Sequence, residues 1–219
     1  MNRLKTLWEH RAGPLAVCYL LAAVVWLVNG VGAVAGDAIA RAGGKLAEQS
    51  LTAADFALVD LQPLDAATDP ATGEAVEPLL TLTGDPQMIL EDVSDRTVRT
   101  LQIWAEYDGE PREMCLYYTT KAGQDYSQDR RVFPVQQPDG SALYTLPRGR
   151  IVALRLDPCS PDEGKQVTIR LHKVALNSGL FWAEPLVPSW YELFCLVLFP
   201  AMAAAALDWL RAVRRRAVA

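Results

Sequence analysis

The chain has 219 residues, of which 51% are hydrophobic, and a formal net charge of −5. That charge is unevenly placed: residues 37–189 carry 23 Asp and Glu against 14 Lys and Arg, whereas the two ends carry 3 acidic and 7 basic residues. Binding to nucleic acid requires clustered Lys and Arg against the phosphates, so an acidic middle excludes a nucleic-acid partner. The middle, about 150 residues long, has the size of a single domain.

The first apolar segment covers residues 12–36, which contain no charged side chain. A helix over this segment is long enough to cross about 30 Å of hydrocarbon. The preceding residues 1–11 are basic, which places them in the cytoplasm. The same segment also fits a cleaved signal peptide, because Ala33-Val34-Ala35 forms an A-x-A cleavage pattern. Both interpretations export the middle of the chain.

The second apolar segment predicts a transmembrane helix over residues 190–210, with aromatic residues near both ends and Pro200 as the expected site of a kink. Four arginines follow in the tail, residues 211–219. The positive-inside rule therefore predicts a cell-membrane protein with both termini cytoplasmic and its main domain extracytoplasmic. A smooth alanine face at 203–206 suits close packing against a partner's helix, whereas a plain lipid anchor needs only the hydrophobicity.

The middle predicts an antiparallel all-β domain over residues 51–177, between linkers at 37–50 and 178–189. The first linker either continues the first helix or forms a separate amphipathic segment. Short strand-like runs recur with turn signals between them and no helical stretch, which is typical of all-β folds. The expected strands are 56–64, 79–84, 97–107, 113–120, 130–136, 141–147, 150–158 and 165–176.

Alternation supports these strands. In 98–107, Leu101 and Ile103 share one face, while Gln102, Trp104 and Glu106 share the other. In 167–176 the apolar register shifts after residue 171, which predicts a β-bulge near Lys173. Seven or eight such strands predict a β-sandwich of two sheets, of the jelly-roll type.

Five runs carry a resemblance to a known class: TLTGDPQMIL (81–90), CLYYTT (115–120), ALYTLP (142–147), RIVALRLDPC (150–159) and TIRLHKVAL (168–176). Together they resemble a carbohydrate-binding-module-like jelly roll of bacterial extracytoplasmic cell-surface polysaccharide proteins, where such domains accompany multi-spanning glycosyltransferases. This chain has neither the many spans nor the catalytic module of those proteins. The resemblance therefore implies an accessory component of the cell envelope, with a multi-spanning membrane protein as its partner.

Catalytic patterns are absent from the sequence. There are two histidines, His10 and His172, and no G-x-S-x-G, H-E-x-x-H or phosphate-binding glycine loop. The chain is therefore not expected to be an enzyme, although acids are frequent enough for a glycosidase-like carboxylate pair to stay open.

A glycan site is expected at Trp104, because aromatic rings stack on sugars and the same face carries Gln102 and Glu106, which bond hydroxyls. Tyr117 is a further candidate for this site. The competing interpretation is that Trp104 packs inside the fold, as tryptophans in sandwiches commonly do.

Two further sites are expected from the middle of the chain. Cys115 and Cys159 are its only two thiols, and an exported domain permits a disulfide between them; two buried free thiols are the equal alternative. A structural calcium ion would need no more than carboxylate oxygens. The available acids are Asp85, Glu91, Asp92, Asp95, Asp157, Asp162 and Glu163.

The sequence thus predicts a non-catalytic, membrane-anchored accessory subunit with a carbohydrate-binding-like domain, which supports cell-surface polysaccharide synthesis or export. The alternative is a structural or interaction subunit of a membrane complex that binds no glycan. A concave, open sheet face bearing Trp104 or Tyr117 would favour the first function, and a flat apolar outer face would favour the second.

Overall fold

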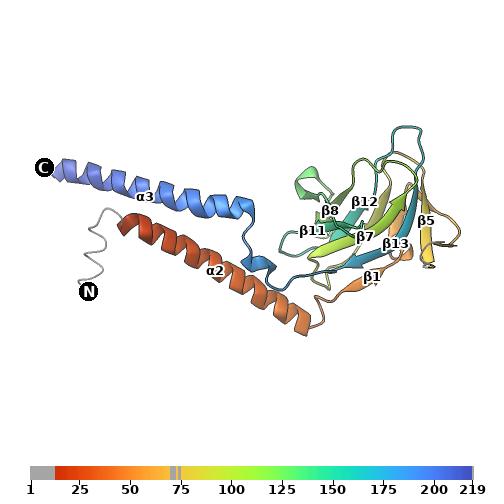
Figure 1. Cartoon of the computed structure of the whole chain (residues 1–219), viewed down its shortest axis with the longest axis horizontal. Coiled ribbons are helices and arrows are strands. Elements are labelled where there is room, and N and C mark those ends of the chain that lie inside the picture. Colours follow the sequence, from red (N-terminus) through yellow and green to blue (C-terminus); the bar gives the residue numbers. More distant parts are fainter. Residues whose placement is uncertain (1–12, 70–72, 74, 219) are drawn as a thin grey trace. The chain divides into compact units, whose positions relative to one another are not determined.

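The computed structural model describes residues 13–69, 73 and 75–218. The chain forms two compact units (Figure 1). One is Ala40–Leu180, which contains the β-structure, and the other combines Met1–Ile39 with Phe181–Ala219, which contain the two long helices. The β-unit is somewhat wider than the expected 51–177.

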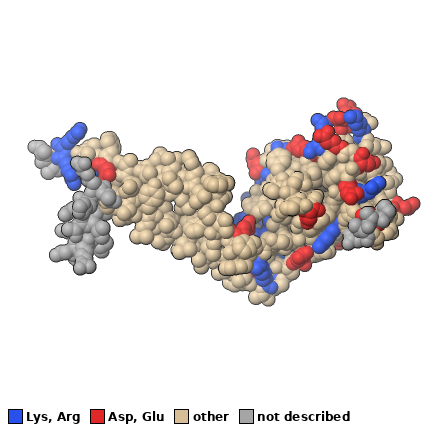
Figure 2. All heavy atoms as spheres, in the orientation of Figure 1, with Lys and Arg blue, Asp and Glu red and all other residues tan. Residues whose placement is uncertain are grey.

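The helical unit contains α2 (Gly13–Ala42) and α3 (Trp190–Val218). Both helices are long and apolar enough to cross a membrane, and Figure 2 shows an almost uncharged surface along them. Ser189 and Glu192 start α3 as a reciprocal capping box: each accepts a hydrogen bond from the other's backbone N–H, at 2.7 and 3.2 Å. This cap explains an acidic residue at the start of an apolar helix.

Two contacts between described residues connect parts of the helical unit. The Tyr19 hydroxyl of α2 donates a hydrogen bond to the Val197 carbonyl of α3, at 2.8 Å. Further along α2, Gly30 lies against the short 3-10 helix η3 (Glu184–Leu186). A Cβ at Gly30 would lie 2.8 Å from a Leu186 methyl group and 2.9 Å from the Pro185 carbonyl oxygen. The backbone of η3 therefore approaches α2 so closely that only glycine fits at position 30.

The β-unit consists of two antiparallel sheets, as predicted. The first sheet has the strand order β10 (Val135–Gln136), β11 (Ala142–Thr145), β7 (Thr100–Tyr107), β13 (Thr168–Leu176), β5 (Ala75–Thr81) and β3 (Leu61–Pro63), with β1 (Gln49–Leu51) paired to β13 and β4 (Ala67–Thr68) paired to β5. The second has the order β2 (Ala57–Val59), β6 (Gln87–Leu90), β12 (Ala153–Asp157), β8 (Cys115–Thr119) and β9 (Arg131–Val132).

The two sheets share one apolar core, to which alternate residues of the strands contribute. Leu101 and Ile103 of β7 are buried in it with Leu116 of β8 and Leu154 and Leu156 of β12. The predicted alternation of 98–107 is thus confirmed, with Trp104 and Glu106 on the outer face. The predicted bulge is also present, because the pairing of β13 with β7 shifts register between Leu171 and Lys173.

Some strands were not expected. β6 has no polar–apolar alternation in QMIL, and β1 and β4 are only three and two residues long, so none of them carries a pattern. β5 starts at Ala75, earlier than the expected 79. Its first part was not predicted, because Pro78 lies inside it. Proline donates no hydrogen bond to a ladder and so argues against a strand in the sequence.

Candidate functional site

A pocket of about 670 Å³ opens on the outer face of the first sheet. It lies over β7 and β13 and is bordered by the turn between β10 and β11 and by the β4–β5 segment. We call it the Trp104 pocket, and its lining residues are Asp69, Ala75, Trp104, Ala105, Glu106, Asp139, Gly140, His172 and Lys173. An adjoining pocket of about 200 Å³ shares Asp69, Glu106 and His172. The predicted glycan-site residues Trp104 and Glu106 therefore line one hollow.

The indole of Trp104 is fixed by its neighbours. Its Nε1 donates a hydrogen bond to Asp139 Oδ2 at 3.1 Å, while the Nζ of Lys173 lies 5.0 Å from the centre of the ring. Asp139 Oδ1 in turn accepts hydrogen bonds from the Ser141 hydroxyl and backbone N–H, at 2.6 and 3.0 Å. These bonds to Ser141 lower the pKa of the Asp139 carboxyl, so it is ionised at neutral pH.

Gln102 supports this turn and does not line the pocket. Its side chain is only 8% exposed, and its Nε2 donates a hydrogen bond to the Ser141 hydroxyl at 2.7 Å. Gln102, Ser141 and Asp139 thus form a chain of hydrogen bonds that ends at the Trp104 indole. Gln102 was expected to contact the glycan directly. The 137–141 turn covers its amide, so Gln102 instead helps to position this turn and, through it, Trp104.

Glu106 stands between two basic side chains of β13. Its Oε1 lies 3.8 Å from His172 Nε2, and its Oε2 lies 3.7 Å from Arg170 Nη1. Glu106 and Arg170 are each 61% exposed, so this ion pair contributes little to stability. The bulge explains why His172 and Lys173, which are adjacent in sequence, both line the pocket: the extra residue lets both side chains face outward before Val174 returns to the core.

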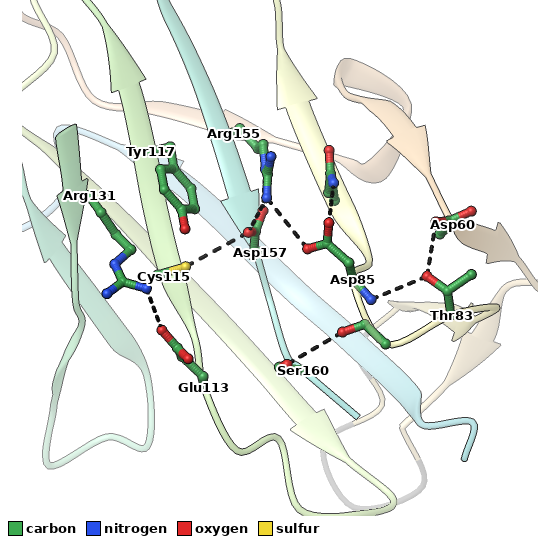
Figure 3. Close-up of polar contacts among 12 residues, drawn as sticks. Asp60, Thr83, Asp85, Glu113, Cys115, Tyr117, Arg131, Arg155, Asp157 and Ser160 are labelled. Atoms are coloured by element: carbon green, nitrogen blue, oxygen red, sulfur yellow. Dashed lines mark hydrogen bonds and ion pairs between the residues drawn. The ribbon is translucent and has the colours of Figure 1, made fainter. Parts of the chain in front are cut away.

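Tyr117 does not join Trp104. It belongs to β8 of the second sheet, on the outer face of that sheet, where it is 7% exposed (Figure 3). The guanidinium of Arg155 lies 4.8 Å from the centre of its ring, and its hydroxyl accepts a hydrogen bond from Gln128 Nε2 at 3.2 Å. The two aromatic candidates thus lie on different sheets, and Tyr117 packs under charged side chains.

Arg155 holds the charges of this second outer face together (Figure 3). Its Nε and Nη2 donate to the two carboxylate oxygens of Asp157 at 2.8 and 2.7 Å, and Nη2 also lies 3.4 Å from Asp85. Burial raises the pKa of the Asp157 carboxyl, and Arg155 opposes that rise. Asp157 in turn raises the pKa of Arg155. This cluster fastens β12 to its neighbours.

The expected disulfide between Cys115 and Cys159 is wrong, since both residues are free and buried thiols. Cys115 faces outward from β8, with its Sγ 3.8 Å from Asp157 Oδ2. Cys159 belongs to the core between the sheets. The two side chains therefore point to opposite sides of the second sheet. Sequence parity could not reveal this, because Cys159 lies beyond the end of its strand.

These thiols are expected to be unreactive. Burial raises the pKa of Cys115 to about 11, with Asp157 adding to the effect, and raises that of Cys159 to about 12. At pH 8 the thiolate fraction is then below that of an ordinary cysteine by about two orders of magnitude for Cys115 and about three for Cys159. Iodoacetamide should label Cys115 about 100-fold and Cys159 about 1,000-fold more slowly in the folded chain than in urea. Recovery of a 115–159 disulfide by non-reducing peptide mapping would contradict the structure.

Five of the seven acids considered for calcium contact other groups of the chain. Asp85 and Asp157 contact Arg155, Asp95 pairs with Arg96, and Asp162 lies against Arg112 and Lys165. Asp92 accepts a hydrogen bond from the Ser94 backbone N–H at 2.8 Å, which lowers the pKa of its carboxyl. Among the described residues, the group with metal-ligand geometry is instead Asp69, Glu106 and His172.

Four polar residues of the Trp104 pocket were not assigned to the site from the sequence: Asp69, Asp139, His172 and Lys173. The sequence contains two features that point to some of these residues. Pro138-Asp139-Gly140 is a recognisable turn, and the register shift at Lys173 predicts an irregular strand. The missing information is which strands pair. The pairing of β7 with β11 and β13 brings Asp139, His172 and Lys173 to Trp104, and the pairing of β13 with β5 and of β5 with β4 brings Asp69.

Comparison with known proteins leaves the family open. No protein-family model and no curated protein matches the sequence. Among solved structures, the chain is similar to a low-affinity xylan-binding module, CBM86, from Roseburia intestinalis, at 16% identity and a TM-score of 0.37, over 59% of this chain and 94% of that one. It is also similar to a β-1,3-glucan-binding CBM6 from Bacillus halodurans, at 7% identity and a TM-score of 0.38, over 60% and 96%.

A third similar structure is the K2 cleaved adhesin domain of Lys-gingipain, at 12% identity and a TM-score of 0.40, over 59% of this chain and 99% of that one. Identities this low concern the fold alone, and TM-scores this low assign no ligand. The function must therefore be argued from the residues of the Trp104 pocket.

Proposed function

We propose that this chain is a non-catalytic, membrane-anchored accessory subunit whose extracytoplasmic β-sandwich, of the carbohydrate-binding jelly-roll type, binds glycan in the Trp104 pocket. The observation that carries the proposal is a hollow on the outer face of a sheet that holds Trp104 between carboxylates and bases. A hollow on an outer sheet face that bears Trp104 favours glycan binding over a purely structural role.

The chemistry of the pocket suits a sugar. The apolar face of a pyranose stacks on an aromatic ring, while its hydroxyls bond to charged and polar groups around the rim. The Trp104 pocket offers acceptors at Asp139 and Glu106 and donors at Lys173 and His172. Because the indole N–H is held by Asp139, the ring is fixed before a ligand arrives, which reduces the entropy cost of binding.

The membrane part of the proposal rests on the two apolar helices and the basic residues beyond them. With α2 and α3 spanning the bilayer and both termini in the cytoplasm, the sandwich faces the cell exterior or periplasm. The alanine face of α3 then suits a multi-spanning partner of the envelope polysaccharide machinery, since close packing of small residues is what associates helices in lipid.

Trp104→Ala tests the glycan proposal. The full chain in nanodiscs is titrated against a panel of soluble cell-surface and plant polysaccharides, and the substitution should weaken binding at least about tenfold by removing the stacking surface. Phe133→Ala is the control, because Phe133 is an exposed aromatic residue of the same unit, under Arg131 and outside the pocket. Equal binding by wild type and Trp104→Ala would overturn the proposed site.

The second candidate function, an interaction subunit without glycan binding, predicts a different outcome. No polysaccharide of the panel would then bind, and a multi-spanning protein would still co-purify in mild detergent. Ala203→Leu combined with Ala206→Leu should lower the recovery of that protein in either case, so the glycan titration is what separates the two functions.

A further inference from the structure

We propose that Asp69, Glu106 and His172 form a binding site for a first-row divalent cation, with Zn²⁺ as the best fit. Each residue offers one ligand atom, and these atoms all lie within 4.8 Å of one another. The three residues come from separate parts of the chain: Asp69 follows β4, Glu106 is on β7 and His172 is on β13. Metal binding at these residues does not depend on the Trp104 pocket binding glycan.

The donor set selects the metal. One imidazole nitrogen with two carboxylate oxygens suits Zn²⁺, which accepts mixed nitrogen and oxygen ligands in four-coordinate sites. Ca²⁺ takes oxygen ligands, so the histidine disfavours calcium. Three protein ligands leave one position open, which is the pattern of zinc sites that bind a water molecule or an external ligand.

The distance between His172 and Glu106 requires only a small adjustment. His172 Nε2 and Glu106 Oε1 are 3.8 Å apart, whereas two ligands at about 2.1 Å from a tetrahedral ion lie roughly 3.4 Å from each other. The Glu106 side chain is 61% exposed and can rotate freely enough to close that difference. No backbone movement is needed for this pair.

Arg170 helps to orient the site. Its Nη1 lies 3.7 Å from Oε2 of Glu106, the oxygen that does not face His172. Arg170 thus lies beside one carboxylate oxygen while the other faces the imidazole. Contacts of this kind, from an outer group to a metal-binding carboxylate, fix the ligand's orientation in metal sites. A guanidinium at this position also limits the negative charge that Asp69 and Glu106 bring together.

The cluster lies where an external ligand can reach it. Asp69, Glu106 and His172 line both the Trp104 pocket and the smaller adjoining pocket. His172 is 17% exposed, so its ring is held by the surrounding protein and yet stays accessible. The bulge in β13 supplies the position, because it places His172 opposite the Ala105–Trp104 step of β7, next to Glu106. A ligand in the hollow could therefore reach an ion bound by these three residues.

Calorimetric titration with ZnCl₂ tests the site. The full chain is purified in detergent without a polyhistidine tag, stripped with EDTA and titrated beside three single variants. His172→Ala and Glu106→Gln should each weaken Zn²⁺ binding at least about tenfold. Glu163→Gln, a change to an exposed acid in the loop before β13, should leave it unchanged. The absence of saturable binding by the wild type, or equal affinity in all four proteins, would overturn the proposal.

Two further measurements keep this outcome interpretable. Thermal unfolding in EDTA should give the same midpoint for all four proteins, which shows that the variants fold. Added ZnCl₂ should then raise the midpoint of the wild type and Glu163→Gln but not that of His172→Ala. Trp104→Ala should bind Zn²⁺ like the wild type, so loss of the glycan site and loss of the metal site are distinguished.

Discussion

Replacing Arg155 with methionine is expected to lower the free energy of unfolding of the β-unit by about 2–3 kcal/mol at pH 7. Removing one partner of a fully buried ion pair costs about 3–5 kcal/mol, because the other charge stays buried without compensation. The side chains of Arg155 and Asp157 are 20% and 10% exposed, so some water reaches the pair. The expected loss is therefore smaller than for a fully buried pair. Methionine keeps most of the side-chain volume between Tyr117 and Tyr126.

The deficit of Arg155→Met should shrink as the pH falls. Burial already raises the pKa of Asp157, and loss of Arg155 raises it further. Between the pKa of Asp157 in the unfolded chain and its higher folded value, the native state binds more protons than the unfolded state. Stability that depends on this group therefore falls as pH rises through that window and is regained on acidification. The difference from wild type should be largest at neutral pH and smaller at pH 4–5.

A double-mutant cycle with Asp157→Asn checks this argument. The double variant has no buried charge at the pair, so it should be more stable at pH 7 than Arg155→Met alone. Urea unfolding of the full chain in detergent, followed by the circular dichroism of the sheets, gives the four free energies. Equal stability of Arg155→Met at pH 7 and pH 4.5, relative to wild type, would mean that the Asp157 charge is not the cause of the loss.

Asn177→Ala is expected to destabilise the β-unit by about 3–4 kcal/mol. Asn177 is 6% exposed, and its amide oxygen accepts a hydrogen bond from the Arg99 backbone N–H at 2.8 Å. Its amide nitrogen donates to the carbonyls of Thr97 and Ala47, at 2.8 and 3.2 Å. Alanine leaves all three backbone groups without this partner, at about 1 kcal/mol each. The backbone at Asn177 also has φ 56°, which alanine adopts at a cost of about 1 kcal/mol.

Asn177→Gly separates the two causes. Glycine adopts a positive φ without strain, so it should recover about 1 kcal/mol relative to alanine while the lost hydrogen bonds remain lost. Thermal unfolding midpoints of wild type, Asn177→Ala and Asn177→Gly in the same detergent give the order directly. If Asn177→Gly matched the wild type, the side-chain hydrogen bonds would contribute nothing and the residue would serve its backbone angle alone.

The sheets could be predicted from the sequence because their long strands alternate clearly. β7, β8, β12 and β13 all lie within expected strands, and the bulge could be located because the apolar register of β13 changes at one point. The sequences of β1, β4 and β6 carry no comparable pattern, and their pairing with other strands decides whether they form. For this reason β1, β4 and β6 emerged only with the structure.

The candidate site was predictable in part. Trp104 and Glu106 share a face through alternation alone, and both line the pocket. Tyr117 was grouped with them on residue type, but the order of strands puts it on the other sheet. The contributions of Asp139 and His172 depend on cross-strand neighbours 35 and 66 residues away from Trp104 and Glu106, and alternation within one strand carries no such information.

The bulge at His172 has an evolutionary consequence. Leu171 and Val174 both enter the core, and two outward residues stand between them where a regular strand would have one. Deleting the codon for His172 would leave Leu171 inward, Lys173 outward and Val174 inward, which is the alternation that the core requires. A single-codon insertion or deletion therefore separates a plain strand from one that carries the imidazole. The β-sandwich and the outward histidine on β13 can therefore vary independently among descendants of the same gene.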